Sequence, residues 1–446
     1  MALETWLVKF KKTIAQRLDS TRATPPTKKK LPTKKSNVAV LAFEIAGLMS
    51  KLLHLYQSLS DKNIARLRTE YICLEGVRKI VSDDDAFLLS LACAELVENL
   101  KSVAKSISRI SKNCEDPSLR SFDRFLLEFV DLGHDTNNWL LGPKEIEVKF
   151  KKMDQLVLTT VTLHREMEEL VALENILKKS LQSKKEQKLI ELQHKILWQR
   201  QEIKYLKDKS LWSRSFDTVT LLLVRSIFTI LSRIKHVFGV GHGFDHIKPS
   251  SALVYPSENP DPLKSPSSLN GFFESNSKIL KPPTSTLGAV ALSLHYSNLV
   301  IVMEKMIRSP QLVGVDARDD LYSMLPNNVR FALRARLKGV GFSASDPFLA
   351  AEWRDALQKI LGWLAPLAHN MIKWQSERSF EQQNMVPKTN VLLFQTLYFA
   401  NQEKTEAAIT ELLVGLNYIW RFEREMNAKA IFQSSNFNGY LNSQAS

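Results

Sequence analysis

The sequence predicts an all-α protein, and three observations support this prediction. Residues 144–238 form a run of 95 residues without Gly or Pro, the two residue types that most often interrupt a helix. Elsewhere apolar residues recur every three to four positions, as in 38–59, which is the period of a helix with a buried face. Asp116-Pro117 and Asp346-Pro347 are typical helix starts. Strand-like alternation is scarce. We therefore expect two helical modules joined by a long helix or helical hairpin and a disordered Pro/Ser-rich linker.

Residues 1–37 are predicted to form a basic N-terminal arm that begins with an amphipathic helix. The segment holds ten Lys/Arg against Glu4 and Asp19. Its apolar side chains fall on one helical face, at Leu3, Trp6, Leu7, Phe10, Ile14 and Leu18. Such a helix can lie on an anionic membrane or dock on a partner, or it can pack on its own domain. The sequence leaves these alternatives open.

A polybasic run without acidic residues follows this helix. It contains Lys28, Lys29, Lys30, Lys34 and Lys35. We interpret the run as a nuclear import signal, with a solvated linker or a polybasic membrane patch as alternatives. Because residue 2 is alanine, we expect no N-myristoylation and therefore no acyl anchor.

Residues 38–142 are predicted to be an N-terminal helical domain of four to five helices. The stretch VAVLAFEIAGLMSKLLHLYQSL has the period of a buried helix. Ser82, followed by three aspartates at 83–85, is a strong helix start, because these side chains can cap free amides and favour the positive end of the helix dipole.

Residues 143–238 are predicted to be a long helical or coiled-coil segment that is basic in its second half. Apolar residues form a seam at Met153, Leu156, Leu163, Met167, Leu170, Leu177 and Leu181. Thr160 and Glu174 interrupt this seam. An intramolecular antiparallel hairpin is therefore favoured over a parallel homodimer through this segment.

Three aromatic residues in the basic half raise the question of nucleic-acid binding. Trp198, Tyr205 and Trp212 are interleaved with Lys and Arg, and such a combination can bind single-stranded nucleic acid. Aromatic residues on a helix more often face a core, however, and we expect that here. Nucleic acid is therefore not an expected partner.

The next segment, 239–285, is predicted to be a disordered linker. Seven of the seventeen prolines fall in it, and no apolar period survives. Ser265, which precedes Pro266, is a candidate phosphosite because added charge there would act on the neighbouring basic helices.

The remainder of the chain is predicted to be a C-terminal helical domain, 286–428, followed by a disordered tail, 429–446. Within the domain, apolar-periodic stretches occur at 347–374, 388–401 and 403–425. Each has the length and period of a helix with a buried face.

Composition and charge narrow the functional classes. The chain of 446 residues is 44% hydrophobic, enough for sizeable cores. Of its net charge of +14, residues 1–37 carry +8 and residues 178–238 carry +9, which leaves −3 for the rest. Basicity confined to two segments favours local electrostatic contacts over nucleic-acid binding by the whole surface.

The cysteines and the apolar segments predict a soluble, intracellular protein. Cys73, Cys93 and Cys114 fit neither a disulfide framework nor zinc-ligand pairs, which favours a reducing compartment. Lysines interrupt the first 20 residues, so a secretory signal is not expected. The apolar stretch Val219–Leu231 is about half a membrane span and contains Arg225.

A search for reactive constellations predicts no catalytic, cofactor-binding or metal-binding residues. Gly239, Gly241 and Gly243 follow a helix, whereas a phosphate-binding loop follows a strand. The possible metal ligands in the same region, His236, His242, Asp245 and His246, lack a visible second shell. His295 with Asp319 or Asp320 would be the centre of a hidden enzyme, but we interpret His295 as structural. We do not expect an enzyme.

Two separated blocks of sequence resemble one plant family. The first block contains VAVLAFEIAGLMSKLLHLYQSLSDKNIARLR, EGVRKIVSDDD and CEDPSLRSFDRF, and the second contains LGAVALSLHYSNLV, RDDLYSMLPNNVRFALRARL and LYFANQEKTEAAITELLVGLNYI. Together they resemble the PSK SIMULATOR proteins and their shorter relatives over most of 38–175 and 286–425. The resemblance implies a role in growth promotion downstream of the sulfated peptide hormone phytosulfokine, in the nucleus or at the plasma membrane. It supplies no catalytic residues.

The leading hypothesis is a non-enzymatic, all-helical interaction protein of plant growth signalling. Its modules would bind protein partners, and its basic segments would set its compartment, for which we expect the nucleus. The alternative is a peripheral membrane-binding module at the cytoplasmic face of the plasma membrane, which would use the amphipathic helix, the polybasic run and the basic segment 178–238.

Overall fold

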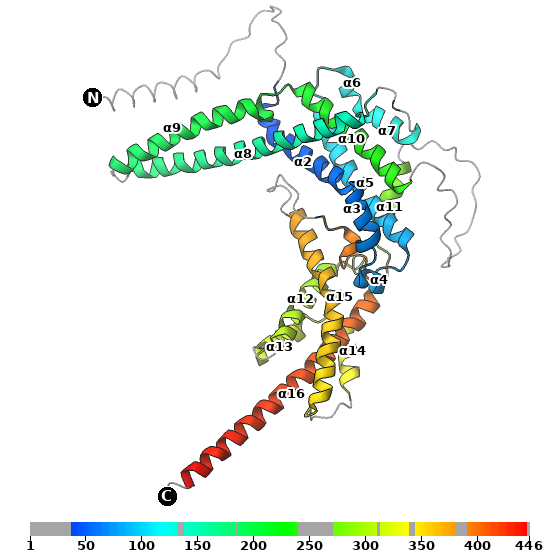
Figure 1. Cartoon of the computed structure of the whole chain (residues 1–446), viewed down its shortest axis with the longest axis vertical. Helices are drawn as coiled ribbons and strands as arrows, with labels where there is room; N and C mark the ends of the chain where they lie inside the picture. The colour runs from blue at the N-terminus through cyan, green and yellow to red at the C-terminus, as the bar shows by residue number, and fades with distance from the viewer. Residues whose placement is uncertain are drawn as a thin grey trace, which may run out of the picture. The chain divides into compact units, whose positions relative to one another are not determined.

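Helices dominate the part of the chain that the computed structural model describes (Figure 1). The described residues are 37–132, 135, 138–182, 186–239, 271–309, 313–338, 344–379 and 390–443. Within these ranges there is no β-strand, and the extended pairings are two isolated bridges, Asn37 with Ser215 and Thr286 with Asn401. The all-α prediction is confirmed.

Three helices form the centre of the first hydrophobic core: α2 (Ala42–Ser58), α5 (Asp85–Ser111) and α10 (Phe216–Phe238). Each packs on the other two through fully buried side chains such as Ile45, Leu91 and Phe228. Shorter helices surround them: α3 (Asp61–Arg66), α4 (Glu75–Ile80), α6 (Pro117–Arg120) and α7 (Phe122–Leu132). Because α10 belongs to this core, the predicted boundary at residue 142 divides a unit that is continuous in the structure.

Aspartates begin several of these helices. Asp84, rather than Ser82, caps α5 by accepting a hydrogen bond from the backbone N–H of Ala86 at 2.8 Å. Asp116 caps α6 in the same way, with Pro117 at the first helical position. The starts predicted from the aspartates and prolines are therefore confirmed, with the first shifted by two residues.

One described helix, Ala39–Ser58, is long and apolar enough to cross a membrane by length and composition alone. Half of it is buried in the structure, and Ala42, Ile45 and Met49 are fully enclosed in the first core. Its apolar character is thus accounted for by packing within the protein.

Helices α8 (Pro143–Gln182) and α9 (Glu186–Lys209) form an antiparallel hairpin (Figure 1). Glu174 of α8 forms an ion pair with Arg200 of α9 at 2.6 Å. The seam position Thr160 is fully buried, and its Oγ1 accepts a hydrogen bond from the backbone N–H of Leu211 at 3.2 Å. The two polar residues that interrupt the predicted seam therefore bind the returning chain, and the intramolecular hairpin is confirmed.

The second hydrophobic core is built around α12 (Ser293–Arg308), α15 (Pro347–Ser379) and α16 (Gln402–Ser443). Two shorter helices, α13 (Val315–Met324) and α14 (Asn327–Leu337), complete it. Asp346 accepts a hydrogen bond from the backbone N–H of Phe348 at the start of α15, as the Asp-Pro signal predicts.

Two predictions of disorder are wrong for the residues that the structure describes. Within the predicted linker 239–285, helix α11 (Gly271–Ile279) packs on α5, because its Phe273 joins the first core. Residues 240–270 lie outside the described part. The predicted tail 429–446 is also helical as far as Ser443, because α16 continues through it.

Within the compact unit Asn37–Ser446, each core contains residues from the part of the chain that mainly forms the other core. Leu393 and Phe394 pack in the first core, whereas Ile80 of α4 packs in the second. The carbonyl of Ile80 also accepts a hydrogen bond from the backbone N–H of Asn401 at 2.7 Å. At Gly76 of α4, a Cβ would lie 2.3 Å from the backbone oxygen of Trp363. Glycine therefore permits the close approach of α4 to α15.

Candidate functional site: a basic groove on helix α5

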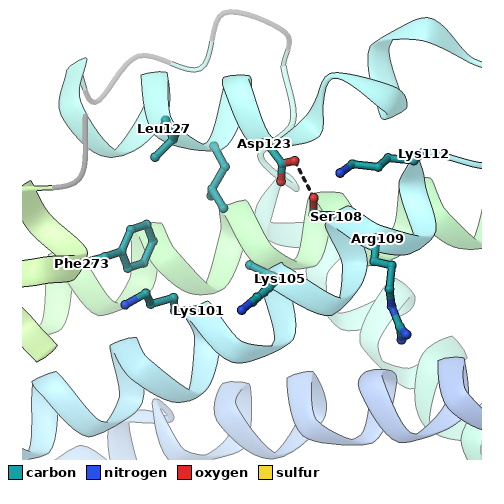
Figure 2. A pocket seen from close by; sticks show the side chains of 10 residues that line it. Lys101, Lys105, Ser108, Arg109, Lys112, Asp123, Leu127 and Phe273 are labelled. Carbon is teal, nitrogen blue, oxygen red and sulfur yellow. Dashed lines mark hydrogen bonds between the residues drawn. The ribbon is translucent and has the colours of Figure 1, made fainter. Parts of the chain in front are cut away.

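The C-terminal half of α5 presents a row of cationic side chains along one wall of a groove (Figure 2). The row consists of Lys101, Lys105, Arg109 and Lys112. Successive members are four, four and three residues apart, so they lie on one face of the helix. The opposite face, which includes Val103 and Ile107, is buried in the first core. Burial of one face therefore fixes the direction in which the cations point.

Helices α7 and α11 supply the other walls of this groove (Figure 2). Their lining side chains Leu126 and Leu127 of α7 and Phe273 of α11 form a largely apolar surface, here called the apolar floor of the groove. The one carboxylate that lines the groove, Asp123 of α7, accepts a hydrogen bond from the Ser108 hydroxyl of α5 at 2.5 Å. The groove is open to solvent and has a volume of about 520 Å³.

The four cations differ in their intramolecular partners. Lys101 contacts Glu98 at 3.5 Å and Ser277 of α11 at 3.2 Å, and Arg109 forms an ion pair with Glu44 of α2. No ion pair or hydrogen bond joins the ammonium groups of Lys105 and Lys112 to another side chain in the described part of the chain. The groove therefore combines an apolar floor with two uncompensated positive charges, an arrangement that can bind an anionic ligand with an apolar part.

A buried carboxylate lies earlier on the same helix. Glu95 is 5% exposed. It accepts hydrogen bonds from the backbone N–H of Leu393 at 2.6 Å and from the indole N–H of Trp374 at 3.2 Å. Burial raises the pKa of Glu95 above its usual value, and these two donors oppose the rise. The residue links α5 to α15 and to the segment that follows α15.

The hidden-enzyme alternative gains no support from the geometry. A ring nitrogen of His295 lies 2.8 Å from the backbone oxygen of Met324, at the end of α13. The neighbouring Tyr296 is fully buried and donates its hydroxyl hydrogen to Glu406 at 2.7 Å. Both contacts hold α12 to adjacent elements, which is the structural role expected for His295.

The structure also bears on metal binding and on the cysteines. Among the described residues, no group of three or more His, Cys, Asp or Glu side chains could hold a metal ion. Cys93 and Cys114 are buried, whereas Cys73 is exposed, and all three are free thiols. Burial raises the pKa of Cys93 to about 12 and that of Cys114 to about 11. Thiols with such high pKa values are poor nucleophiles at neutral pH.

Several residues singled out in the sequence lie outside the described part: Lys28, Lys29, Lys30, Lys34, Lys35 and Ser265. The aromatic residues of the basic segment are described, and the expectation that they face a core is wrong for two of them. Trp198 is 63% exposed and Tyr205 is 57% exposed, whereas Trp212 packs against Phe43. The hairpin seam lies on the other side of α9, so this exposure follows from the pairing with α8.

The basic groove was not predicted from the sequence. The signal was present as the spacing of basic residues in KSVAKSISRISK, residues 101–112. It was hidden because the module as a whole is close to neutral. The wall contributed by α7 follows α5 closely in the chain, whereas that of α11 comes from a distant position, and both meet α5 through tertiary packing that only the fold reveals.

Two family models match the chain. Residues 40–96 match "Domain of unknown function (DUF3475)", which covers α2 through the first half of α5. Residues 286–373 match "Protein of unknown function (DUF668)", which covers α12 through most of α15. Fold and domain content thus define an all-helical protein that pairs DUF3475 with DUF668.

Similarity to three proteins of Arabidopsis thaliana extends over most of the chain. Protein PSK SIMULATOR 1 is 27% identical over 86% of the chain, PSK SIMULATOR 3 is 28% identical over 87%, and PSK SIMULATOR 2 is 25% identical over 90%. The aligned regions span 56%, 57% and 62% of the lengths of these relatives. No solved structure matches the chain significantly. The chain is thus similar over most of its length to the PSK SIMULATOR proteins, as the sequence resemblance predicts, and it spans a little over half the length of these relatives.

Proposed function

We propose that this chain is a non-enzymatic regulator of plant growth that acts in phytosulfokine-linked signalling by binding protein partners. One observation carries the proposal: the similarity to three proteins named PSK SIMULATOR extends across 86–90% of the chain and includes both domains. The relatives carry the name of a signalling regulator rather than that of an enzyme class. The basic groove is the candidate docking site for a partner.

Seedling growth tests this proposal directly. Plants that lack the gene, and plants that overproduce the full chain, are grown with and without synthetic phytosulfokine, and root and hypocotyl lengths are measured. We expect shorter organs without the gene, longer organs with excess protein, and a weakened hormone response in the absence of the protein. Unchanged growth and an unchanged hormone response in both lines would contradict the proposal.

The proposed compartment is the nucleus, on the basis of the polybasic run. A fluorescent fusion of the full chain is compared with a variant in which Lys28, Lys29, Lys30, Lys34 and Lys35 are changed to Gln. The matched control changes Lys9, Lys11 and Lys12 to Gln. We expect nuclear fluorescence that only the first variant loses. Fluorescence that lines the plasma membrane and becomes diffuse in the first variant would instead indicate an electrostatic membrane anchor.

A further inference from the structure

We propose that the basic groove on α5 is the docking site for a short acidic segment of a protein partner, one that also carries an apolar anchor side chain. The inference deepens the proposed function, on which it rests for the assumption that the partner is a protein. The cations of the groove define the acidic groups of the expected ligand, and the apolar floor of the groove defines its apolar side chain.

The uncompensated charges of Lys105 and Lys112 define the acidic part of the expected ligand. Both side chains are exposed at the groove, and seven residues separate them on one helical face, which corresponds to about 10 Å along the axis. Two carboxylates of an extended peptide can span such a distance. Charge-assisted hydrogen bonds between ammonium and carboxylate groups are among the stronger polar contacts available to an interface.

The apolar floor of the groove defines the apolar part of the expected ligand. Leu126, Leu127 and Phe273 line a volume of about 520 Å³, which lies within the range of about 300–1,000 Å³ that is typical of ligand pockets. A buried apolar or aromatic anchor surrounded by polar contacts is the usual organisation of a peptide interface. Simple ions would leave this floor uncovered, whereas a side chain such as Leu or Phe would fill it.

The acidic residues around the row favour a short peptide over a polyanion. Asp123 lines the groove, Glu98 contacts Lys101 at one end of the row, and Glu44 contacts Arg109, its third member. Three carboxylates thus accompany the four cations. A continuous phosphate backbone or an anionic membrane surface would lie against these carboxylates as well, at a cost in repulsion. A short segment can contact Lys105 and Lys112 alone.

A peptide array tests the proposal on the full-length protein. The probes are 12-residue peptides in which Asp and Glu flank a central Leu or Phe, together with analogues that carry Asn and Gln instead. The strongest binders are then measured in solution by fluorescence anisotropy. We expect acidic peptides to bind at least tenfold more tightly than their neutral analogues. Equal affinity for acidic and neutral peptides, or no binding of either, would overturn the proposal.

Variants locate the binding. Lys105→Glu with Lys112→Glu is expected to weaken the acidic peptides at least tenfold. The matched control, Lys151→Glu with Lys152→Glu, makes the same charge change at exposed positions of α8 and is expected to change affinity less than twofold. Equal losses in both double variants would overturn the assignment. Binding to phosphatidylserine vesicles and to a 12-nucleotide single-stranded DNA is measured in parallel. If the groove variant loses affinity only for one of these two probes and not for the acidic peptides, the assignment is also overturned.

Growth of plants that carry the variants separates failure of this inference from failure of the proposed function. If the unmodified chain promotes growth and the groove variant does so equally well, the groove inference falls and the proposed function stands. If the groove binds acidic peptides but the unmodified chain leaves growth unchanged, the proposed function falls and the binding site remains. We expect the groove variant alone to lose growth promotion while it keeps the thermal stability of the unmodified protein.

Discussion

Helix α5 uses charge in two opposite ways along its length. In its first half, Glu95 is buried and accepts two hydrogen bonds from α15 and the segment after it. In its second half, Lys105 and Lys112 are exposed and form no ion pair within the described part of the chain. The carboxyl group of Glu95 is thus buried and hydrogen-bonded, whereas the ammonium groups of Lys105 and Lys112 are exposed to solvent and have no ion-pair partner among the described residues.

The difference separates architecture from recognition. A buried charge must be satisfied, because an unpaired one costs several kcal/mol in free energy of folding. Its removal therefore disturbs the fold. An exposed cation interacts with water, so its removal leaves the fold nearly unaffected and changes only what can bind to the surface. Substitutions of buried and exposed polar residues test this distinction.

Replacement of Glu95 by Ala should lower the free energy of unfolding by about 3 kcal/mol. The change leaves the backbone N–H of Leu393 and the indole N–H of Trp374 without an acceptor in a largely buried setting and adds a cavity. Urea denaturation followed by circular dichroism measures the loss. A loss below about 1 kcal/mol would show that water or other groups readily replace the carboxylate.

The pH dependence of a Glu95→Gln variant sharpens this test. Burial raises the pKa of Glu95 above its usual value of 4.5, so the folded protein holds this proton more tightly than the unfolded chain. The resulting contribution to stability is fully present below pH 4.5 and is lost as the pH rises through the raised pKa. Gln does not titrate. The melting temperature of the variant relative to wild type should therefore increase over that pH range, and a constant difference would contradict the shift.

The contact of α4 with α15 should be nearly as sensitive as Glu95. A Cβ at residue 76 would lie 2.3 Å from the backbone oxygen of Trp363, so Gly76→Ala forces the helices apart, at a cost of about 2 kcal/mol. Gly47 of α2 is the matched control, because a Cβ built there meets no atom within 4 Å apart from its chain neighbours and the backbone of its own helix. Gly47→Ala should stabilise the protein by about 0.5–1 kcal/mol through helix propensity. Thermal melts compare the two variants, and similar effects in both would contradict a close approach at Gly76.

Thr160 extends the comparison to the hairpin, because it is another buried polar group with a defined partner. Thr160→Val keeps the shape of the side chain but removes the acceptor for the backbone N–H of Leu211. We expect a loss of about 1–2 kcal/mol. Faster hydrogen exchange confined to the turn around 210–214 would locate the effect. Thr162→Val is the control, since Thr162 bonds only to the carbonyl of Leu158 in its own helix. Equal losses in the two variants would contradict the role of Thr160.

Much of this fold could be predicted from local patterns. The Asp-Pro starts at 116 and 346, the long interval without Gly or Pro, and the polar interruptions at Thr160 and Glu174 all depend on neighbouring residues, and the structure confirms each of them. Predictions that depended on distant packing were less secure. Helix α11 lies in a Pro-rich segment and is held by Phe273 in a core formed by α5. No pattern within residues 271–279 indicates that partner.

The same limit applies to the candidate site. The row on α5 could have been found from its spacing, whereas the walls from α7 and α11 could not, because they meet α5 only through tertiary packing. The burial of Glu95 was likewise unpredictable, since its donors, Leu393 and Trp374, lie about 280–300 residues away in sequence. The exposed Trp198 and Tyr205 show the converse: an aromatic residue on a helix faces outward when the seam lies on the other side. A homodimer through this segment, the less favoured alternative, stays untested.

The smallest expected effect is that of Lys105→Gln on the free energy of unfolding. It distinguishes the two halves of α5 most clearly, because this substitution should stabilise the protein whereas the loss of Glu95 should destabilise it. Lys105 lies four residues from Lys101 and four from Arg109, and like charges at this spacing destabilise a helix by about 0.2–0.5 kcal/mol per pair. Lys105→Gln should therefore raise the free energy of unfolding by a few tenths of a kcal/mol at low salt. The gain should fade as added salt screens the repulsion. Lys62→Gln, at an exposed position of α3, is the control, and repeated urea titrations at two ionic strengths make the comparison.

A clear loss of stability in Lys105→Gln would mean that the cation has an intramolecular role, and the contrast with Glu95 would no longer hold. A gain would show that the helix retains a charge that slightly destabilises it, as expected for a residue kept for binding.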